Sequence, residues 1–311
     1  MIRRQELGKV VAFVSCALFL TTAAQADGQP RGRAAGPAAT PAAAPAAPSS
    51  WSGLYVGANA GYAWGGDDGA SIAGNDPVFQ SMFNGTAFPG GTSFARSRAL
   101  DRDGLTGGVQ VGYNWQVGSA WVVGVETDFN WADFEGRGAT IGIIDAGPPV
   151  VAGTVRGIQD VDWYGTLRAR VGVLAANHVM LYATGGLAYG RIREAATFSA
   201  DVVGGGSAGG YSIQCPAANI PCAVGRSSDT QFGWTVGAGG EFLLSSNITV
   251  RAEYLYVDLG DGGAVTAVAT TPTPGLAAAS FKTTFNDVDF HTVRLGINFK
   301  LGGDCCATAR K

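Results

Sequence analysis

The strongest candidates for chemistry in this chain of 311 residues are nine charged residues. They fall on the same face of segments whose side chains alternate between two faces. They carry both signs in nearly equal number: Glu126, Asp128, Asp162, Arg168, Arg170, Glu241, Arg251, Glu253 and Arg294. Residues two apart in a strand point to the same face of a sheet. Charges gathered on one enclosed face must pair or stay hydrated, because an isolated buried charge is very costly. The pattern predicts a salt-bridged plug, with a narrow selective pore as the alternative. Arg294 is expected to pair with Glu253 on the neighbouring strand.

The histidines do not form a recognisable catalytic arrangement. His178 is followed by Val179 and Met180, and His291 by Thr292 and then Val293. Some small membrane barrels are enzymes that modify lipid A, and the lipid-A deacylases among them place a serine two residues after a histidine. Neither histidine of this chain has a serine at that position. Two histidines are also too few for a histidine-built metal centre. We therefore expect no enzymatic activity, no metal and no cofactor.

Cys215 and Cys222 enclose the segment "CPAANIPC". In an exported protein, thiols this close in sequence tend to pair. The sequence therefore predicts a disulfide within one long loop. Cys305 and Cys306 are adjacent and have no partner ligands, so they do not form a metal motif.

The N-terminus has the features of an export signal. Three basic residues precede an apolar run over 10–20, which the small-x-small site Ala24-Gln25-Ala26 follows. The run is too short to span a bilayer. We expect a signal peptide over 1–26 and an Ala/Pro-rich periplasmic spacer over 27–50. The folded part, a predicted β-barrel, is expected over 51–301, and a C-terminal tail over 302–311. A sequence pI near 5.4 gives no indication of a nucleic-acid partner.

The elements that must position the charges are strands. The segment "WSGLYVGANAGYAWGG", from Trp51, alternates large apolar residues with glycine and small polar ones. Similar alternation predicts strands over 52–64, 105–117, 120–134, 157–174, 178–192, 229–243, 247–260 and 287–301. Tight turns alternate with long, polar, glycine-rich connections, as in outer-membrane barrels. The predicted fold is all-β, an eight-stranded antiparallel up-and-down transmembrane β-barrel with short periplasmic turns and four long extracellular loops. No helical segment is expected.

The face opposite the charges is apolar and carries aromatic residues at two heights, typical of two membrane interfaces. The expected belts contain Trp64, Trp115, Trp121, Trp131, Trp163, Tyr189, Trp234, Tyr256 and Phe299. The apolar face is therefore expected to meet lipid, and the small residues opposite to make room for larger neighbours in the lumen.

The opening segment at Trp51 and "DVDFHTVRLGINFKL" near the C-terminus resemble the small outer-membrane barrels of Rhizobiales and related alphaproteobacteria. These are known as porin-family or outer-membrane immunogenic proteins. The resemblance implies an outer-membrane location, surface-exposed loops and a largely structural role in envelope integrity. Some members are described as haemin-binding, but the loops here offer only Met82 and Tyr211 as haem ligands.

The predicted function is a structural and surface-interaction barrel of the Gram-negative cell outer membrane, with a largely plugged lumen. A narrow porin-like channel is the alternative, and haemin binding a weaker one. The expected partners are outer-membrane lipid, lipopolysaccharide and the barrel-assembly machinery. Both termini are expected on the periplasmic side, because an even number of strands returns the chain to its starting side.

Overall fold

The computed structural model describes residues 51–65, 70–84, 103–142 and 153–301. The expected signal peptide (1–26), spacer (27–50) and tail (302–311) lie outside these residues. None of the helices within the described ranges is long and apolar enough to span a membrane.

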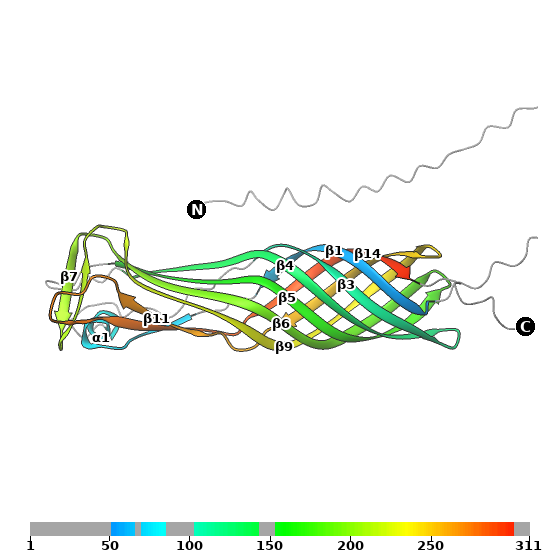
Figure 1. Cartoon of the computed structure of the whole chain (residues 1–311), viewed down its shortest axis with the longest axis horizontal. Coiled ribbons are helices and arrows are strands. Elements are labelled where there is room, and N and C mark those ends of the chain that lie inside the picture. The colour runs from blue at the N-terminus through cyan, green and yellow to red at the C-terminus, as the bar shows by residue number, and fades with distance from the viewer. Residues whose placement is uncertain (1–50, 66–69, 85–102, 143–152, 302–311) are drawn as a thin grey trace, which may run out of the picture. The chain divides into compact units, whose positions relative to one another are not determined.

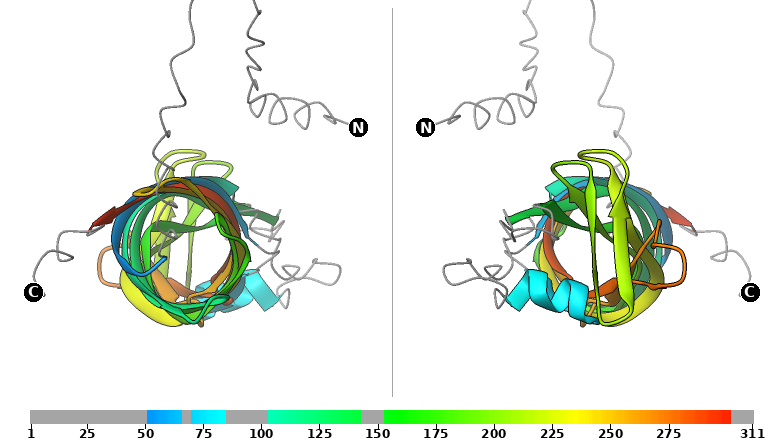
Figure 2. Two further views of the ribbon diagram at one scale, coloured as in Figure 1. Left: turned by 90° about the vertical axis from the view of Figure 1, so that its right-hand side faces the viewer. Right: turned by 90° about the vertical axis from the view of Figure 1, so that its left-hand side faces the viewer.

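Eight strands close into a ring, as predicted. Each pairs antiparallel with the next, and the last pairs with the first, so that the ring is seen end-on in Figure 2. In ring order they are β1 (Gly53–Gly65), β3 (Asp103–Val117), β4 (Trp121–Gly142), β5 (Gly153–Ala176), β6 (Val179–Ala200), β9 (Pro221–Ser245), β10 (Ile248–Asp258) and β14 (Asp289–Leu301). A closed ring leaves no strand edge unpaired. A sheet that spans a membrane must be closed in this way, because lipid offers no partners for backbone N–H and C=O groups.

Four strands run further than the sequence predicted. β4 continues to Gly142, β5 begins at Gly153, β6 ends at Ala200 and β9 begins at Pro221. Further elements occupy parts of the connections that were expected to be loops: β2 (Ala70–Gly74), α1 (Pro77–Asn84), β7 (Gly204–Ala208), β8 (Tyr211–Cys215), β11 (Ala264–Ala269), β12 (Ala277–Ala278) and β13 (Ser280–Phe285). Figure 1 shows α1, β7 and β11 gathered beyond one end of the ring.

We call this second region the head. It comprises β2, α1, β7, β8, β11, β12 and β13 together with residues 153–160, 193–200 and 221–228 of the long strands. Its strands continue the barrel sheet in the order β6-β9-β11-β13-β2. The head has an apolar core, which includes Phe79, Val155, Phe198, Ile213, Phe281 and Phe285.

The helix α1 corrects the expectation that no helical segment exists. Asp76 caps it, because its Oδ1 accepts hydrogen bonds from the backbone N–H groups of Val78 (3.1 Å) and Phe79 (3.3 Å). Pro77 stands at the first helical position, where its missing N–H costs nothing. The helix buries Phe79 and Met82 in the head core. It is therefore an amphipathic helix that covers one part of the head.

Candidate functional site in the barrel lumen

The barrel lumen holds four arginines and four carboxylates in mutual contact. We call them the lumen network: Glu126, Asp128, Arg168, Arg170, Glu241, Arg251, Glu253 and Arg294. Their side chains are between 0% and 3% exposed. They come from β4, β5, β9, β10 and β14, which lie all around the ring. The four positive and four negative formal charges cancel within the group.

Arg168 contacts three carboxylates from two strands. Its Nη2 donates to Glu126 Oε1 at 2.5 Å and to Asp128 Oδ2 at 2.8 Å, and its Nη1 donates to Glu253 Oε1 at 3.0 Å. Its Nε donates to Thr166 Oγ1 at 2.9 Å. Hydrogen bonds between charged groups are stronger than neutral ones, especially where water is absent. Arg168 therefore cross-links β5 to β4 and to β10 on the opposite side of the lumen.

Arg294 lies directly opposite Glu253 in the register of β14 with β10. Its Nε donates to Glu253 Oε2 at 2.6 Å, and its Nη2 donates to Asp128 Oδ2 at 2.8 Å. The pair expected from the inward parity is thus present, and Asp128 extends it to β4. Asp128 is consequently shared between Arg168 and Arg294.

Two tyrosines belong to the same lumen. Tyr55 donates to Glu126 Oε2 at 2.6 Å and accepts from Arg170 Nη1 at 2.9 Å. The Arg170 guanidinium also lies 4.0 Å from the centre of the Tyr182 ring, a cation–π contact. Glycine provides the space: a Cβ on Gly112 would lie 2.3 Å from the Tyr55 hydroxyl, and one on Gly239 would lie 2.6 Å from that of Tyr182.

Arg170 and Arg251 complete the ion pairs. Arg170 Nη2 donates to Glu241 Oε2 at 2.7 Å, and Arg251 Nη1 donates to Glu126 Oε2 at 2.5 Å. Glu241 Oε1 also accepts from Thr249 Oγ1 at 2.5 Å. Each carboxylate of the network therefore has at least one arginine partner.

A row of amides, which the sequence analysis did not single out, joins the network at Glu241. Asn59 Nδ2 donates to Gln110 Oε1 at 2.6 Å, and Gln110 Nε2 donates to Asn298 Oδ1 at 2.8 Å. Asn298 Nδ2 in turn donates to Glu241 Oε1 at 3.1 Å. These residues share the inward parity of the charges, so the same rule applied to neutral polar side chains would have found them, and Tyr182 as well.

Apolar clusters lie on both sides of the lumen network. Toward the head, the lumen contains Ala63, Tyr164, Ile192, Leu255 and Phe290 with their neighbours. At the short-turn end, Trp51 packs with Val122, Met180 and Tyr182. The Trp51 indole donates to the carbonyl oxygen of Asn177 at 3.3 Å. The charged layer is therefore enclosed between two apolar layers.

Asp162 does not belong to the network, which corrects the sequence prediction. Its carboxylate pairs instead with Arg193 Nη2 at 2.7 Å and lies 3.9 Å from Arg191 Nε, and both arginines are exposed. The register of β5 with β6 shifts between Val161 and Trp163. A bulge of this kind reverses the inside–outside alternation. For the same reason Val161, expected to face lipid, is 2% exposed and packs in the lumen.

The nine residues of the expected aromatic belts lie at the two ends of the outward face. Trp115, Trp121 and Phe299 are exposed near the short turns, and Trp64, Trp131 and Trp234 are exposed toward the head. The remaining three, Trp163, Tyr189 and Tyr256, are half-buried at the head end. They pack against other aromatic rings, with centroids 6.1 Å apart for Trp163 and Tyr189 and 5.2 Å apart for Tyr256 and Trp234.

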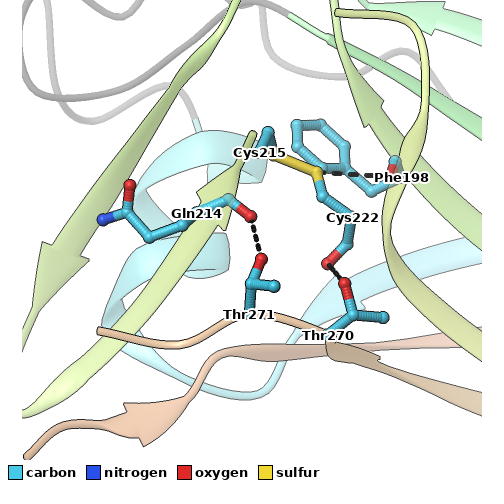
Figure 3. The surroundings of a disulfide bond; sticks show 6 residues. All are labelled: Phe198, Gln214, Cys215, Cys222, Thr270 and Thr271. Carbon is cyan, nitrogen blue, oxygen red and sulfur yellow. Dashed lines mark hydrogen bonds between the residues drawn. A yellow bond between two sulfur atoms is a disulfide. The ribbon is translucent and has the colours of Figure 1, made fainter. Parts of the chain in front are cut away.

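Cys215 and Cys222 form a disulfide bond. It joins the end of β8 to the start of β9 inside the head core (Figure 3), and both cysteines are 1% exposed. Thr270 Oγ1 donates to the carbonyl oxygen of Cys222 at 3.1 Å, so the segment after β11 is held beside it. The bond thus ties two strands in a packed region rather than shortening a flexible loop.

Within the described ranges, no group of three or more His, Cys, Asp and Glu side chains is arranged to hold a metal ion. What the lumen arrangement does chemically is neutralise buried charge and cross-link strands across the barrel.

Comparison with known proteins identifies relatives. A family model described as outer membrane protein beta-barrel domain matches residues 34–300. The chain is 35% identical over 252 residues to the 31 kDa outer-membrane immunogenic protein of Brucella melitensis, which covers 81% of this chain and 84% of that protein. It is 33% identical over 155 residues to the 22 kDa outer membrane protein of Rhizobium leguminosarum bv. viciae, covering 50% of this chain and 53% of the relative.

Solved structures with a similar arrangement include OprG of Pseudomonas aeruginosa, with 14% identity and a TM-score of 0.37, covering 80% of this chain and 97% of that one. Another is Ail of Yersinia pestis, with 14% identity and a TM-score of 0.32, covering 80% and 99%.

Proposed function

The chain belongs to the outer membrane protein β-barrel family and is located in the outer membrane, and from that premise we propose that it is a closed structural barrel that holds a folded head at the cell surface. The barrel anchors and the head makes contacts outside the cell. No catalytic step is part of this proposal.

The lumen network is the observation that carries the proposal. An eight-stranded barrel is just wide enough for side chains to fill. Here four arginines and four carboxylates fill it, with side chains no more than 3% exposed. A solute would have to break several charge-assisted hydrogen bonds and then cross the apolar layer on either side. Ions therefore meet a barrier at the charged layer and at the apolar layer on each side of it.

The outward orientation of the head rests on the connections between strands. At one end β3–β4, β5–β6 and β9–β10 are joined by turns of two or three residues. Outer-membrane barrels place such short turns in the periplasm and their longer connections outside the cell. The Brucella relative is named an immunogenic protein, which fits a surface-exposed region in this family.

Conductance measurements test the closed lumen. The mature protein, refolded and inserted in a planar lipid bilayer, should give no resolvable current steps. Arg294→Ala should open the network at Glu253 and Asp128 and so allow small steps. Arg226→Ala, which removes an exposed arginine of the head, is the matched control and should stay silent. Large, stable steps from the unaltered protein would replace this proposal with the narrow porin-like channel.

A further inference from the structure

A series of basic side chains continues the lipid-facing surface of the barrel into the head. Outward residues of β6 alternate without interruption from Leu187 through the belt residue Tyr189 to Arg191 and Arg193. Along one face of one strand, the side chains thus change from aliphatic to aromatic to cationic. In a membrane protein that order follows the hydrocarbon core, the interface and the charged headgroup layer.

The next strands show the same change. Phe232 of β9 is 76% exposed, and six residues away on the same outward parity β9 carries the exposed Arg226. Gly225, beside Arg226, packs against the backbone of Thr266 in β11, and Thr266 pairs with the exposed Lys282 of β13. On the other side of β6, β5 contributes the exposed Arg156, opposite Thr197.

We call these five residues the basic face: Arg156, Arg191, Arg193, Arg226 and Lys282. Arg191 and Arg193 have side chains 46% and 58% exposed, and Arg193 pairs with Asp162. Arg191 Nε donates to Ser228 Oγ at 2.9 Å, which holds the guanidinium against the sheet. Among the described residues, Arg156, Arg226 and Lys282 form no ion pair. Their charges are open to an external anion.

The neighbouring part of the barrel rim, from β10 through β14 to β3, carries the other sign. Asp103 of β3, Asp258 of β10 and Asp289 of β14 have outward parity there, and Asp258 pairs with Asp289 in the strand register. Like charges directly opposite each other repel. Among the side chains that the structure describes, the outward positive charge at this level therefore lies in the sector formed by β5, β6, β9 and β13, where Asp160 and Asp162 offset part of it beside Arg193.

We propose that the basic face binds the phosphate groups of lipopolysaccharide in the outer leaflet. Arg191 lies two residues beyond Tyr189, about 7 Å along the strand, and Arg226 lies six residues beyond Phe232, about 20 Å. The cations thus cover the level of the lipid headgroups and of the sugars next to them. Arginine forms paired hydrogen bonds with phosphate oxygens, and lipopolysaccharide carries phosphates at this depth. The inference rests on the outward orientation of the head proposed above.

The test measures binding of lipopolysaccharide to the full mature protein refolded in detergent micelles. In the test variant four cations are replaced: Arg191→Ser, Arg193→Ser, Arg226→Ser and Lys282→Ser. Binding should weaken on the order of 100-fold, because each basic residue near an anionic lipid surface adds to the attraction. Binding by the unaltered protein should also weaken as salt increases, because these charges are exposed to solvent.

The matched control replaces the three rim aspartates on β3, β10 and β14: Asp103→Asn, Asp258→Asn and Asp289→Asn. This variant should bind lipopolysaccharide at least as tightly as the unaltered protein. Equal binding by the four-fold serine variant would overturn the proposal. So would equally tight binding of phosphatidylglycerol vesicles, which would indicate a general anionic surface, or full competition by inorganic phosphate, which would indicate a site for the free ion.

A separate measurement isolates the orientation. Thr284→Cys places a thiol at an exposed position of β13, in a background with Cys305→Ser and Cys306→Ser. Labelling by a membrane-impermeant maleimide on intact cells should succeed. Failure to label would overturn the outward orientation and with it the lipopolysaccharide contact in cells. Labelling without any loss of binding in the serine variant would overturn only the lipid proposal.

Discussion

The barrel and the head share three strands, β5, β6 and β9, whose inward and outward faces differ in polarity between the two regions. Along β6, inward residues are Tyr182 and Thr184 in the barrel but Ala196 and Phe198 in the head. The outward residues change in the reverse direction, from leucine to arginine. In the barrel lipid covers the outside, so the polar groups must lie inside. In the head water covers the outside, so the apolar groups must lie inside.

This comparison shows that one strand can lie in lipid at one end and in water at the other, provided that its polar and apolar faces exchange places along its length. In β5 a bulge between Val161 and Trp163 accompanies the transition. In β6 the residue types themselves reverse while the alternation continues. The two regions should therefore depend on different forces: charge pairing in the barrel and apolar packing in the head.

The largest expected effect is on the barrel. Arg168→Met removes the cation that three carboxylates share, and leaving buried charge without a partner costs about 3–5 kcal/mol. The free energy of unfolding in lipid vesicles, measured by urea titration, should fall by this amount. Arg226→Met, at an exposed position of the head, should change it by less than about 0.5 kcal/mol. Equal effects of the two substitutions would remove the distinction between the regions.

The next effect is confined to the head. Phe281 is 0% exposed, and its ring centre lies 4.9 Å from that of Phe79 in α1. Phe281→Ala should destabilise the head by about 3 kcal/mol, at the lower end for this substitution because a short surface helix can move into the space. Limited proteolysis should then cleave the head and leave a protected fragment of the barrel. Loss of both regions together would show that they fold as one unit.

A smaller effect is expected for the disulfide. Replacing both Cys215 and Cys222 by serine opens a link across a sequence separation of 7 residues. The chain-entropy model gives a loss of about 2.5 kcal/mol for a loop of this size. Hydrogen exchange of the amides in β8 and at the start of β9 should quicken, whereas exchange in β1 and β14 should not. Faster exchange in β14 would contradict the independence of the barrel.

The smallest expected effect is on the pH dependence of stability, and it concerns acidic residues that have no arginine partner in the described part of the chain. Slight desolvation and the nearby Asp261 carboxylate raise the pKa of Asp287, an exposed residue between the head strand β13 and β14. The acids of the lumen network, by contrast, each contact an arginine. A raised pKa means that the folded head binds the proton more tightly than the unfolded chain does. This contribution therefore favours the folded head at low pH and fades as pH rises through the pKa of Asp287.

Asp261→Asn should reduce this pH dependence, measured as head unfolding between acidic and neutral pH. Asp201→Asn, at an exposed position just after β6, serves as the control and should leave it unchanged. A pH dependence that survives Asp261→Asn in full would show that other groups cause it.

The barrel was predictable from the sequence, because lipid imposes a strict alternation that eight segments display. The inward position of Arg294 beside Glu253 followed from parity alone. Asp162 and Val161 were placed on the wrong faces because a bulge leaves no trace in a simple alternating count.

The head was missed for a different reason. Its strands are rich in alanine, glycine and serine, as in "REAATFSA" from Arg193, and such residues give weak alternation. The start of α1 was visible in the sequence as Asp76 followed by Pro77, a typical helix beginning. The aromatic partners of Phe79 outside the helix, however, are Phe198 and Phe281, which lie more than one hundred residues away in the chain, and local patterns do not reveal them.

Because Arg294 lies on β14, the neutrality of the lumen also depends on whether that strand is in place. β14 is the last strand of the ring, and its pairing with β1 closes the ring. Without it, the lumen contains three arginines and four carboxylates, since Arg294 is the only member that β14 supplies. A barrel that lacked this strand would carry one uncompensated negative charge in its lumen, which Arg294 neutralises. Separating β14 from the finished barrel therefore requires breaking its backbone pairing with β1 and β10 and the ion pairs of Arg294 together.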